Sequence, residues 1–221
     1  TDSALARRLH LDQVMRDHHA VLTRELDMFA EGRNQIQLRR NFADSPLLYV
    51  PKVYSQLSRR HMLVMERVYG VPIGQIDTLR TAGVDFQVLA HKGVETFFTQ
   101  VFDHNFFHAD MHPGNIQVDI SNPADPSYIA LDCAIVGSLE QQDIDYLAQN
   151  ILAFFRRDYR AVVDLHLRSG WIPATTDAEN FERVIAEVCD PIFNKPLSEI
   201  SFADFMTQLL RAAADFNMEI Q

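Results

Sequence analysis

The chain has 221 residues, of which 47% are apolar and 23% charged, so it has the composition of an ordinary globular protein with a sizeable core. Asp and Glu number 30 against 20 Lys and Arg, and the resulting formal net charge of −10 argues against general binding to nucleic acid. The two cysteines, Cys133 and Cys189, lack metal-ligand spacing and are too few for a disulfide framework, and no apolar run approaches the ~20 residues of a membrane span.

The first 70 residues predict a long helix and two strands. Apolar residues recur at roughly helical spacing over 11–42, and Pro46 ends this region. The segments YVPKVYSQL (49–57) and HMLVMERVYG (61–70) are rich in Val, Tyr, Met and Leu and flank a short polar turn. This pattern predicts two paired strands.

The middle of the chain predicts two helices, a loop and a hairpin. A short helix is expected over 76–82 and a longer one over 85–105, with Asp85 as its N-cap. The apolar residues expected on the buried face of the longer helix are Leu89, Phe97, Val101 and Phe102. The segment HADMHPGN (108–115) is expected to be a loop because of its Pro-Gly pair. Two short strands, IQVDI and YIALDC, are expected around the turn SNPADPS.

The remainder of the chain is predicted to be helical. The expected helices are 138–157, with Ser138 and Gln141 resembling a capping box, and then 158–169, 177–189 and 201–217. Strands and helices are segregated along the chain rather than alternating. This order indicates an α+β protein and not a doubly wound sheet.

Three polar residues around the predicted hairpin have the order and spacing of a phosphoryl-transfer site. Such a site needs an Asp to orient the acceptor, an Asn five positions later to hold a metal ion, and a second metal-binding Asp after the next hairpin. Asp110, Asn115 and Asp132 supply these groups in that order. An acidic residue following a buried strand needs a partner, and a divalent cation can be that partner.

The same segments resemble a known family. HADMHPGN together with LDCAIVGSL resembles the signature of the UbiB/ADCK atypical kinase family, most closely its bacterial UbiB branch. ELDMFAEGRNQIQLRRNF is similar to the helix-C region of that family, LVMERVYGVPI to its fifth strand and hinge, and FNKPLSEISF to its C-terminal helical region. The resemblance implies a protein-kinase-like fold, with a partial N-lobe in 1–70 (helix C and two strands to the hinge) and a helical C-lobe with the catalytic loop in 71–221.

The resemblance also implies roles for individual residues. Asp110 matches the catalytic-loop aspartate, and Asn115 and Asp132 match ligands of Mg²⁺. Glu31 matches the helix glutamate that pairs with the nucleotide-binding lysine. The other implied site residues are Glu25 and Asp27, a Glu-x-Asp element that pairs with a lysine of an N-terminal extension, and Glu66 to Val68, whose backbone would face the adenine of ATP.

The sequence departs from the family pattern in three ways. Ala134 replaces the glycine of the usual Asp-Phe-Gly motif, which removes freedom at positive φ. No Ala-Pro-Glu segment follows, so a long activation loop for protein substrates is not expected. No lysine precedes Lys52, so the strand lysine that should pair with Glu31 is missing. We therefore expect the chain to be part of a longer protein, with membrane helices beyond Gln221.

The function implied by the resemblance is that of an ATP- and Mg²⁺-dependent atypical kinase or ATPase in ubiquinone biosynthesis. The expected location is the cytoplasmic face of the bacterial inner membrane, with this segment outside the bilayer. The expected partners are nucleotide, prenylated quinone precursors or a lipid surface, and other ubiquinone-biosynthesis proteins, but no nucleic acid. For the isolated 221 residues we expect weak or absent turnover of ATP, because Glu31 lacks its lysine.

Other interpretations of the same residues stay open at this point. The domain could be a non-catalytic nucleotide-binding scaffold or a lipid-handling partner of the quinone-biosynthesis enzymes. His108, Asp110 and His112 could form a His-x-Asp-x-His site for a transition metal. The alternative for both histidines is structural hydrogen bonding within the loop. Glu25 and Glu31 could lie on a solvated helix face, and Cys133 is expected to be a small buried hydrophobic residue.

Overall fold

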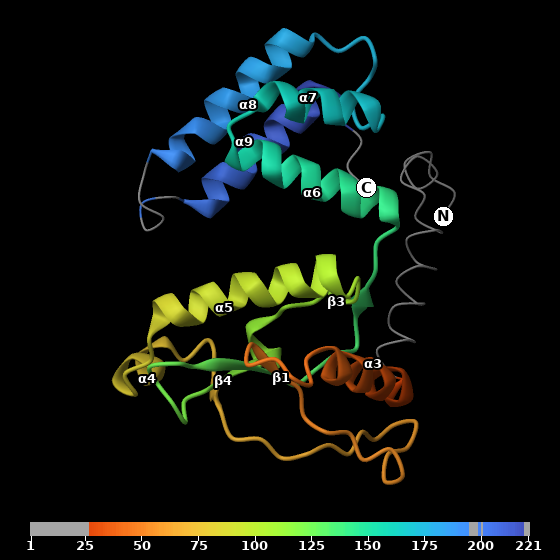
Figure 1. Cartoon of the computed structure of the whole chain (residues 1–221), viewed down its shortest axis with the longest axis vertical. Coiled ribbons are helices and arrows are strands. Elements are labelled where there is room, and N and C mark those ends of the chain that lie inside the picture. The colour runs from red at the N-terminus through yellow and green to blue at the C-terminus, as the bar shows by residue number, and fades with distance from the viewer. Residues whose placement is uncertain (1–26, 195–198, 200, 219–221) are drawn as a thin grey trace, which may run out of the picture. The chain divides into compact units, whose positions relative to one another are not determined.

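The computed structural model of the chain describes residues 27–194, 199 and 201–218 (Figure 1). The chain divides into two compact units, residues 1–138 and 139–221. The first unit contains all described strands, and the described helices of the second unit form a bundle. The α+β class predicted from the sequence is confirmed.

The division at residue 138 differs from the predicted lobe boundary at residue 70. Strand β1 (Leu48–Tyr49) pairs in parallel with β5 (Ser127–Ala130), so one sheet joins segments from both sides of residue 70. The assignment of lobes to 1–70 and 71–221 stays a prediction.

Helix α3 (Met28–Asn41) is the first described element. Asp27 is its N-cap, and its carboxylate accepts hydrogen bonds from the backbone N–H groups of Phe29 and Ala30 at 3.0 and 3.3 Å. The buried residues include Glu31, Gln35 and Leu38, which lie three or four positions apart and therefore share one face. The predicted helix over 11–42 is confirmed from residue 28, and its first part lies outside the described residues.

The main sheet has four short strands in the order β1-β5-β4-β2. Strands β4 (Ile116–Asp119) and β5 form an antiparallel hairpin, and β2 (Val71–Pro72) pairs antiparallel with β4. A second sheet pairs β3 (Phe107–His108) with β6 (Val136–Gly137). The predicted hairpin is confirmed, although its second strand ends at Ala130 and therefore two residues before Asp132.

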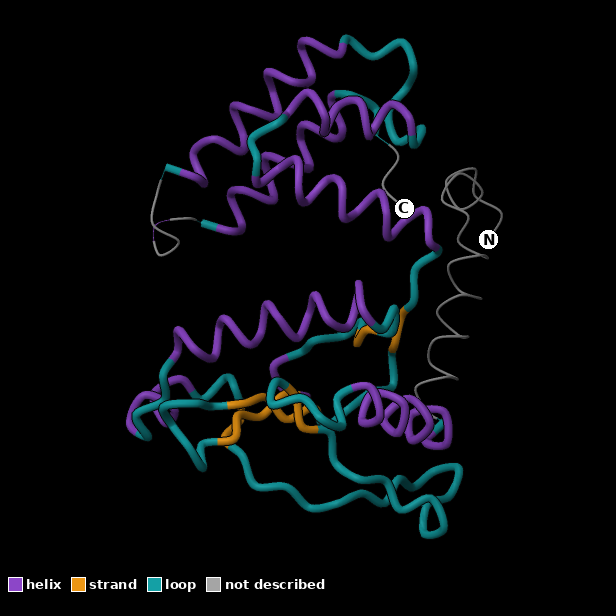
Figure 2. Tube along the Cα trace, in the orientation of Figure 1, coloured by secondary structure: helices purple, strands orange, loops and turns teal. Residues whose placement is uncertain are grey.

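The two strands predicted for 49–57 and 61–70 are wrong for most of their length, and Figure 2 shows this segment as loop. The two arms do run antiparallel, but only isolated bridges and a few backbone hydrogen bonds join them. Pro51 has no N–H to donate to a ladder. Near the tip, the Ser58 hydroxyl donates to the Tyr54 carbonyl and accepts from the Val64 N–H, so a side chain replaces backbone pairing.

Helices α4 (Ile76–Thr81) and α5 (Phe86–Phe98) confirm the two helices predicted for the middle of the chain. Asp85 is the N-cap of α5 as expected, since its carboxylate accepts from the N–H groups of Gln87 and Val88. A short π-helix, Thr99–Asp103, follows directly.

The buried face predicted for the helix over 85–105, which the structure divides into α5 and the π-helix, is only partly correct. Leu89 and Val101 are 4% and 2% exposed, whereas Phe97 is 48% exposed. The buried positions also include three polar residues, which are Lys92, Thr96 and Gln100. The pattern of apolar residues does not mark these polar positions as buried. It therefore assigned Phe97 to the buried face, which the neighbouring Thr96 occupies instead.

The second unit contains α6 (Gln141–Phe155), α7 (Tyr159–Arg168), α8 (Ala178–Phe193) and α9 (Phe202–Asp215). Its core gathers buried side chains from these helices and from the α7–α8 connection, including Val163, Ile172, Phe181 and Ile185. The four predicted helices are confirmed, with α8 extending past residue 189.

The capping box predicted for Ser138 and Gln141 is wrong. Helix α6 begins after Glu140, so Glu140 and not Ser138 is its N-cap, and the Glu140 side chain makes no capping hydrogen bond. The start of this helix therefore lies two residues later than the capping pattern indicated.

Candidate active site

The open end of the β4–β5 hairpin holds two of the three predicted site residues. Ile116 pairs with Ala130 in the last register of the hairpin. One step further, the Leu131 N–H donates to the Asn115 carbonyl at 2.9 Å, so Asn115 lies opposite the residue that precedes Asp132. Antiparallel pairing therefore brings these two positions together across the hairpin.

The β3–β6 pair brings the start of the predicted catalytic loop close to the open end of the β4–β5 hairpin. His108 is in register with Val136, and the Ala109 N–H donates to the Ile135 carbonyl at 3.0 Å. The loop that begins at Ala109 therefore starts beside the segment that follows Asp132.

The His108 side chain links the loop to Asp132 directly. Its Nδ1 accepts a hydrogen bond from the Asp110 N–H at 3.1 Å, and its Nε2 bonds the Asp132 carbonyl. This pattern requires the neutral tautomer with the proton on Nε2. His108 is 7% exposed, and the Gln100 amide oxygen accepts from the backbone N–H of His108 at 2.9 Å. Asp110, Asn115 and Asp132 thus belong to one hydrogen-bonded network, while their chemical roles stay predictions.

Both loop histidines have structural hydrogen bonds, as their alternative interpretation expected. The His112 Nδ1 accepts from the Gly114 N–H at 3.0 Å, which caps the short 3₁₀ helix Pro113–Asn115. Within the described ranges, no three His, Cys, Asp or Glu side chains are placed to hold a metal ion together. The hypothesis of a transition-metal site at His108, Asp110 and His112 is therefore wrong, because the His108 ring nitrogens are used within the fold.

The Asp132–Ala134 segment forms a tight turn that a hydrogen bond to the Asp132 side chain closes. The Asp132 carboxylate accepts from the Ala134 N–H at 2.7 Å. Ala134 does not adopt a positive φ, so the observed turn does not require the glycine that the family pattern has at this position. Cys133 is fully buried, and burial, with smaller contributions from Asp132 and Glu31, raises the pKa of its thiol to about 12. It is the buried hydrophobic residue that was expected.

Helix α3 places Glu31 near Asp132. Glu31 is 9% exposed, and burial, reinforced by the negative charge of Asp132, raises its pKa. Among the ion pairs of the described residues, none includes Glu31. The pairing of Glu31 with a nucleotide-binding lysine stays a prediction. The solvated-face interpretation of Glu31 is wrong.

The acidic pair Glu25 and Asp27 is only partly described. Glu25 lies outside the described residues. Asp27 uses its carboxylate as the N-cap of α3. Pairing of either residue with an upstream lysine stays a prediction.

The predicted hinge, Glu66 to Val68, is an irregular segment that leads to β2. The Glu66 carboxylate accepts from the Lys52 N–H at 3.0 Å and from the Tyr49 hydroxyl at 2.7 Å. These hydrogen bonds, with smaller contributions from the Arg39 and Lys52 charges, lower the pKa of Glu66. The Glu66 side chain therefore fixes the hinge to the preceding arm, while contact of its backbone with adenine stays a prediction.

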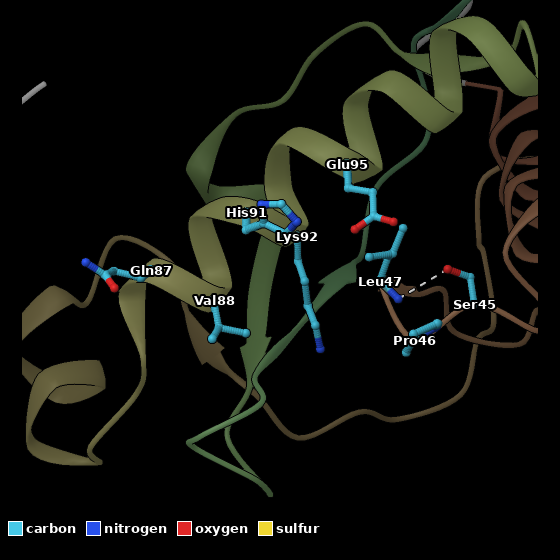
Figure 3. A pocket seen from close by; sticks show the side chains of 8 residues that line it. All are labelled: Ser45, Pro46, Leu47, Gln87, Val88, His91, Lys92 and Glu95. Atoms are coloured by element: carbon cyan, nitrogen blue, oxygen red, sulfur yellow. Dashed lines mark hydrogen bonds between the residues drawn. The ribbon is translucent and has the colours of Figure 1, made fainter.

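A surface hollow of about 490 Å³ lies between Ser45–Leu47 and helix α5 (Figure 3). None of the predicted site residues lines it. Its buried cation, Lys92, already pairs with the Asp125 carboxylate at 2.6 Å. A second cavity, of about 200 Å³, reaches the catalytic loop and is lined by His108 and Met111 together with mostly apolar residues and the polar Thr96 and Gln100.

Comparison with known proteins decides the family. The sequence matches the ABC1 atypical kinase-like domain over residues 2–166 and the UbiB helical domain over residues 185–221. The chain belongs to the ABC1 atypical kinase-like family. This confirms the resemblance inferred from HADMHPGN and LDCAIVGSL.

Curated relatives agree with this placement in the ABC1/UbiB family. The chain is 55% identical over 219 residues to "Probable protein kinase UbiB" of Pseudomonas paraeruginosa and equally to that of Azotobacter vinelandii, covering 99% of this chain and 41% of each relative. It is 54% identical over 215 residues to the same-named protein of Erwinia tasmaniensis, covering 97% and 39%. The chain thus spans about two-fifths of the length of these relatives.

One solved structure supports the kinase-like fold of the ABC1 family. The Mycobacterium tuberculosis protein Rv3197, solved in complex with erythromycin, superposes with a TM-score of 0.54 at 20% identity. The match covers 75% of this chain and 41% of that one. In the part of this ABC1-family chain that the structure describes, no helix is both long and apolar enough to cross a bilayer.

Two parts of the site were not found from the sequence. Asn34 on α3 contacts the Asp132–Ala134 turn, and Gln100 on the π-helix accepts from the His108 backbone. The spacing of Asn34 three residues after Glu31 was the available signal, because residues at i and i+3 share a helix face.

Proposed function

We propose that the protein containing this chain binds ATP with Mg²⁺ and hydrolyses it or transfers its phosphoryl group, in support of ubiquinone biosynthesis. The observation that carries the proposal is the network in which His108 joins the backbones of Asp110 and Asp132 beside Asn115. Membership of the ABC1/UbiB family supports the proposed pathway and the proposed kinase-like chemistry. The cytoplasmic face of the bacterial inner membrane is the proposed location.

Each predicted residue of this site would have a separate role in the reaction. Asp110 would orient the acceptor hydroxyl or water and accept its proton. The amide oxygen of Asn115 and the carboxylate of Asp132 would hold Mg²⁺, a cation that prefers oxygen ligands and supplies charge neutralisation at the phosphates. Glu31 would pair with the lysine that positions the nucleotide, a residue outside this chain.

The other predicted site residues would contact the adenine of the nucleotide or an N-terminal extension. The backbone of Glu66 to Val68 would face adenine, and Glu25 and Asp27 would bind a lysine of an N-terminal extension. Prenylated quinone precursors, a lipid surface and other ubiquinone-biosynthesis proteins are the proposed partners, and no nucleic acid is among them.

A second candidate function is a nucleotide-binding scaffold that organises or hands over lipid without useful turnover. The connection between β6 and α6 favours it, because Gly137 is followed within four residues by the first residue of the helix, Gln141. This leaves little room for a segment that docks a protein substrate.

The test uses the full-length protein with lipid vesicles and measures both ATP turnover and the shift of melting temperature by ATP with Mg²⁺. We expect Asp110→Asn to lower turnover about 100-fold while nucleotide binding persists. Asp132→Asn and Asn115→Ala are expected to remove the part of the thermal shift that depends on Mg²⁺.

Asp119→Asn is the matched control, since Asp119 lies at the other end of the same hairpin and its carboxylate accepts from the Ser121 N–H. Full activity of both Asp132→Asn and Asn115→Ala would contradict the assigned metal ligands. A Mg²⁺-dependent thermal shift without turnover under any lipid condition would support the scaffold.

A further inference from the structure

Asn34 connects helix α3 to the turn that follows Asp132. Its side-chain amide Nδ2 lies 3.0 Å from the Cys133 carbonyl oxygen and 3.5 Å from that of Ala134. The contact joins residues 99 positions apart in the sequence, and the Asn34 side chain is half-buried. A single amide group of α3 therefore donates toward two consecutive carbonyls of the turn.

The same turn is held from other directions as well. His108 Nε2 bonds the Asp132 carbonyl, and the Ala134 N–H binds the Asp132 carboxylate at 2.7 Å. The Leu131 N–H is held by the Asn115 carbonyl. Asn34 adds a hydrogen bond that fixes this segment to α3, beside the apolar cluster that Cys133 shares with Leu38 of the same helix.

A fixed turn matters because α3 also carries an acidic side chain that interacts unfavourably with Asp132 when both are ionised. Glu31 lies one helical turn before Asn34 on the same face, and its carboxylate is close enough to that of Asp132 for the two to repel. Repulsion alone would favour movement of Asp132 away from the helix. The donated hydrogen bonds of Asn34 act against that movement.

We propose that Asn34 is a positioning residue, which holds the Asp132–Ala134 turn against α3 so that the Asp132 carboxylate is presented to the metal-bound nucleotide. This inference rests on the proposed Mg²⁺-nucleotide function and deepens it. An asparagine suits the position because its NH₂ group donates to carbonyls, whereas an aspartate would place oxygen against oxygen and add a negative charge close to Asp132.

The experiment uses the full-length protein with Asn34→Ala and Asn34→Asp. The matched control is Gln37→Ala, which removes an amide hydrogen bond from the exposed side of the same helix, where Gln37 donates to Asn41 at 2.8 Å. The first readout is the Mg²⁺ concentration that gives half-maximal ATP turnover. The second is hydrogen exchange of the peptide covering 131–137, measured without nucleotide, with the peptide of α7 as an internal reference for intact folding.

We expect Asn34→Ala to raise the half-maximal Mg²⁺ concentration on the order of tenfold, as loss of a partner that orients a metal ligand does. Asn34→Asp is expected to raise it further. Exchange in 131–137 becomes faster in both variants, while α7 and the Gln37→Ala protein behave as the unsubstituted protein does. A merely structural role would lower the melting temperature without changing the Mg²⁺ requirement.

Unchanged exchange in 131–137, or an unchanged Mg²⁺ requirement, in Asn34→Ala would overturn the positioning role. An equal effect of Gln37→Ala would overturn it as well. If the unsubstituted protein shows no Mg²⁺-dependent binding of nucleotide, the proposed function fails and the positioning role fails with it. Nucleotide binding by the unsubstituted protein therefore distinguishes failure of the proposed function from failure of the positioning role alone.

Discussion

At the scale of single residues, the described part of the chain buries charged and polar groups in two different ways. Lys92 has a carboxylate partner within the fold, whereas the described residues offer Glu31 no cation. Burial without a partner disfavours the ionised form of a carboxyl group, and burial with a partner tolerates it. The two side chains therefore predict opposite effects on stability.

Replacing Glu31 with glutamine is expected to stabilise the 221-residue chain at neutral pH. Because the folded-state pKa of Glu31 lies above the ordinary value of 4.5, the folded state holds the proton more tightly than the unfolded state does. Stability is therefore lost as the pH rises through the interval from 4.5 to the raised folded-state pKa. Melting temperatures from pH 4 to pH 8 should show an advantage of Glu31→Gln that vanishes at the acidic end.

The control for Glu31→Gln is Glu95→Gln, which removes a carboxylate from an exposed position of α5. A lower melting temperature of Glu31→Gln than of the unsubstituted chain at pH 8 would contradict the prediction.

Lys92→Ala is expected to destabilise the first unit by about 1 kcal/mol or more. The Lys92 side chain is only 11% exposed, and its ion pair with Asp125 joins α5 to the turn of the β4–β5 hairpin. Arg80→Ala is the comparison, since the Arg80–Asp77 pair is 68% and 98% exposed and should contribute less than about 0.5 kcal/mol. Urea unfolding of Lys92→Ala and Arg80→Ala measures both values. Equal losses of stability from the two substitutions would show that burial of Lys92 does not strengthen its ion pair with Asp125.

At the scale of elements, α5 packs against the sheet through a glycine. The Tyr128 hydroxyl of β5 donates to the Leu89 carbonyl of α5 at 2.8 Å. A Cβ at Gly93 would lie only 2.7 Å from that hydroxyl oxygen. The helix can therefore lie this close to the strand only because residue 93 has no side chain. In Figure 1, α5 runs along one side of the sheet.

Gly93→Ala is expected to destabilise the first unit by roughly 1–3 kcal/mol, the usual cost of an added group in a packed contact. Thermal unfolding gives the value. Gly74→Ala is the control, because a Cβ at Gly74 meets nothing within 4 Å and the change should be neutral or slightly stabilising. If Gly93→Ala unfolds like Gly74→Ala, the close contact with Tyr128 does not limit the packing of α5.

At the scale of the whole molecule, the two compact units have separate hydrophobic cores. Val118 is fully buried in a cluster with Leu79, Val84 and Leu89 in the first unit. Val163 is fully buried in the helical cluster of the second. A unit with its own core can unfold cooperatively by itself.

We expect substitutions in the two cores to act on different unfolding transitions. Val118→Ala and Val163→Ala each delete two buried methyl groups and should cost about 2 kcal/mol in their own unit. Hydrogen exchange resolved by peptide measures this, because each variant should exchange faster within its own unit and not in the other. Equal acceleration in both units for either variant would contradict independent unfolding.

The sequence by itself determined the α+β class, the main helices, the β4–β5 hairpin, the family and the set of candidate site residues. These features depend on local signals, such as the Asp85 cap, the period of apolar residues and the long motif HADMHPGN. The structure decided what local signals do not encode. The irregular arms around Ser58, the exposure of Phe97 and the late start of α6 all depend on competition between backbone pairing, side-chain caps and burial of polar groups. Only the tertiary structure joined Asn34 of α3 to the turn after Asp132, because a contact across 99 residues is fixed by packing and has no local pattern.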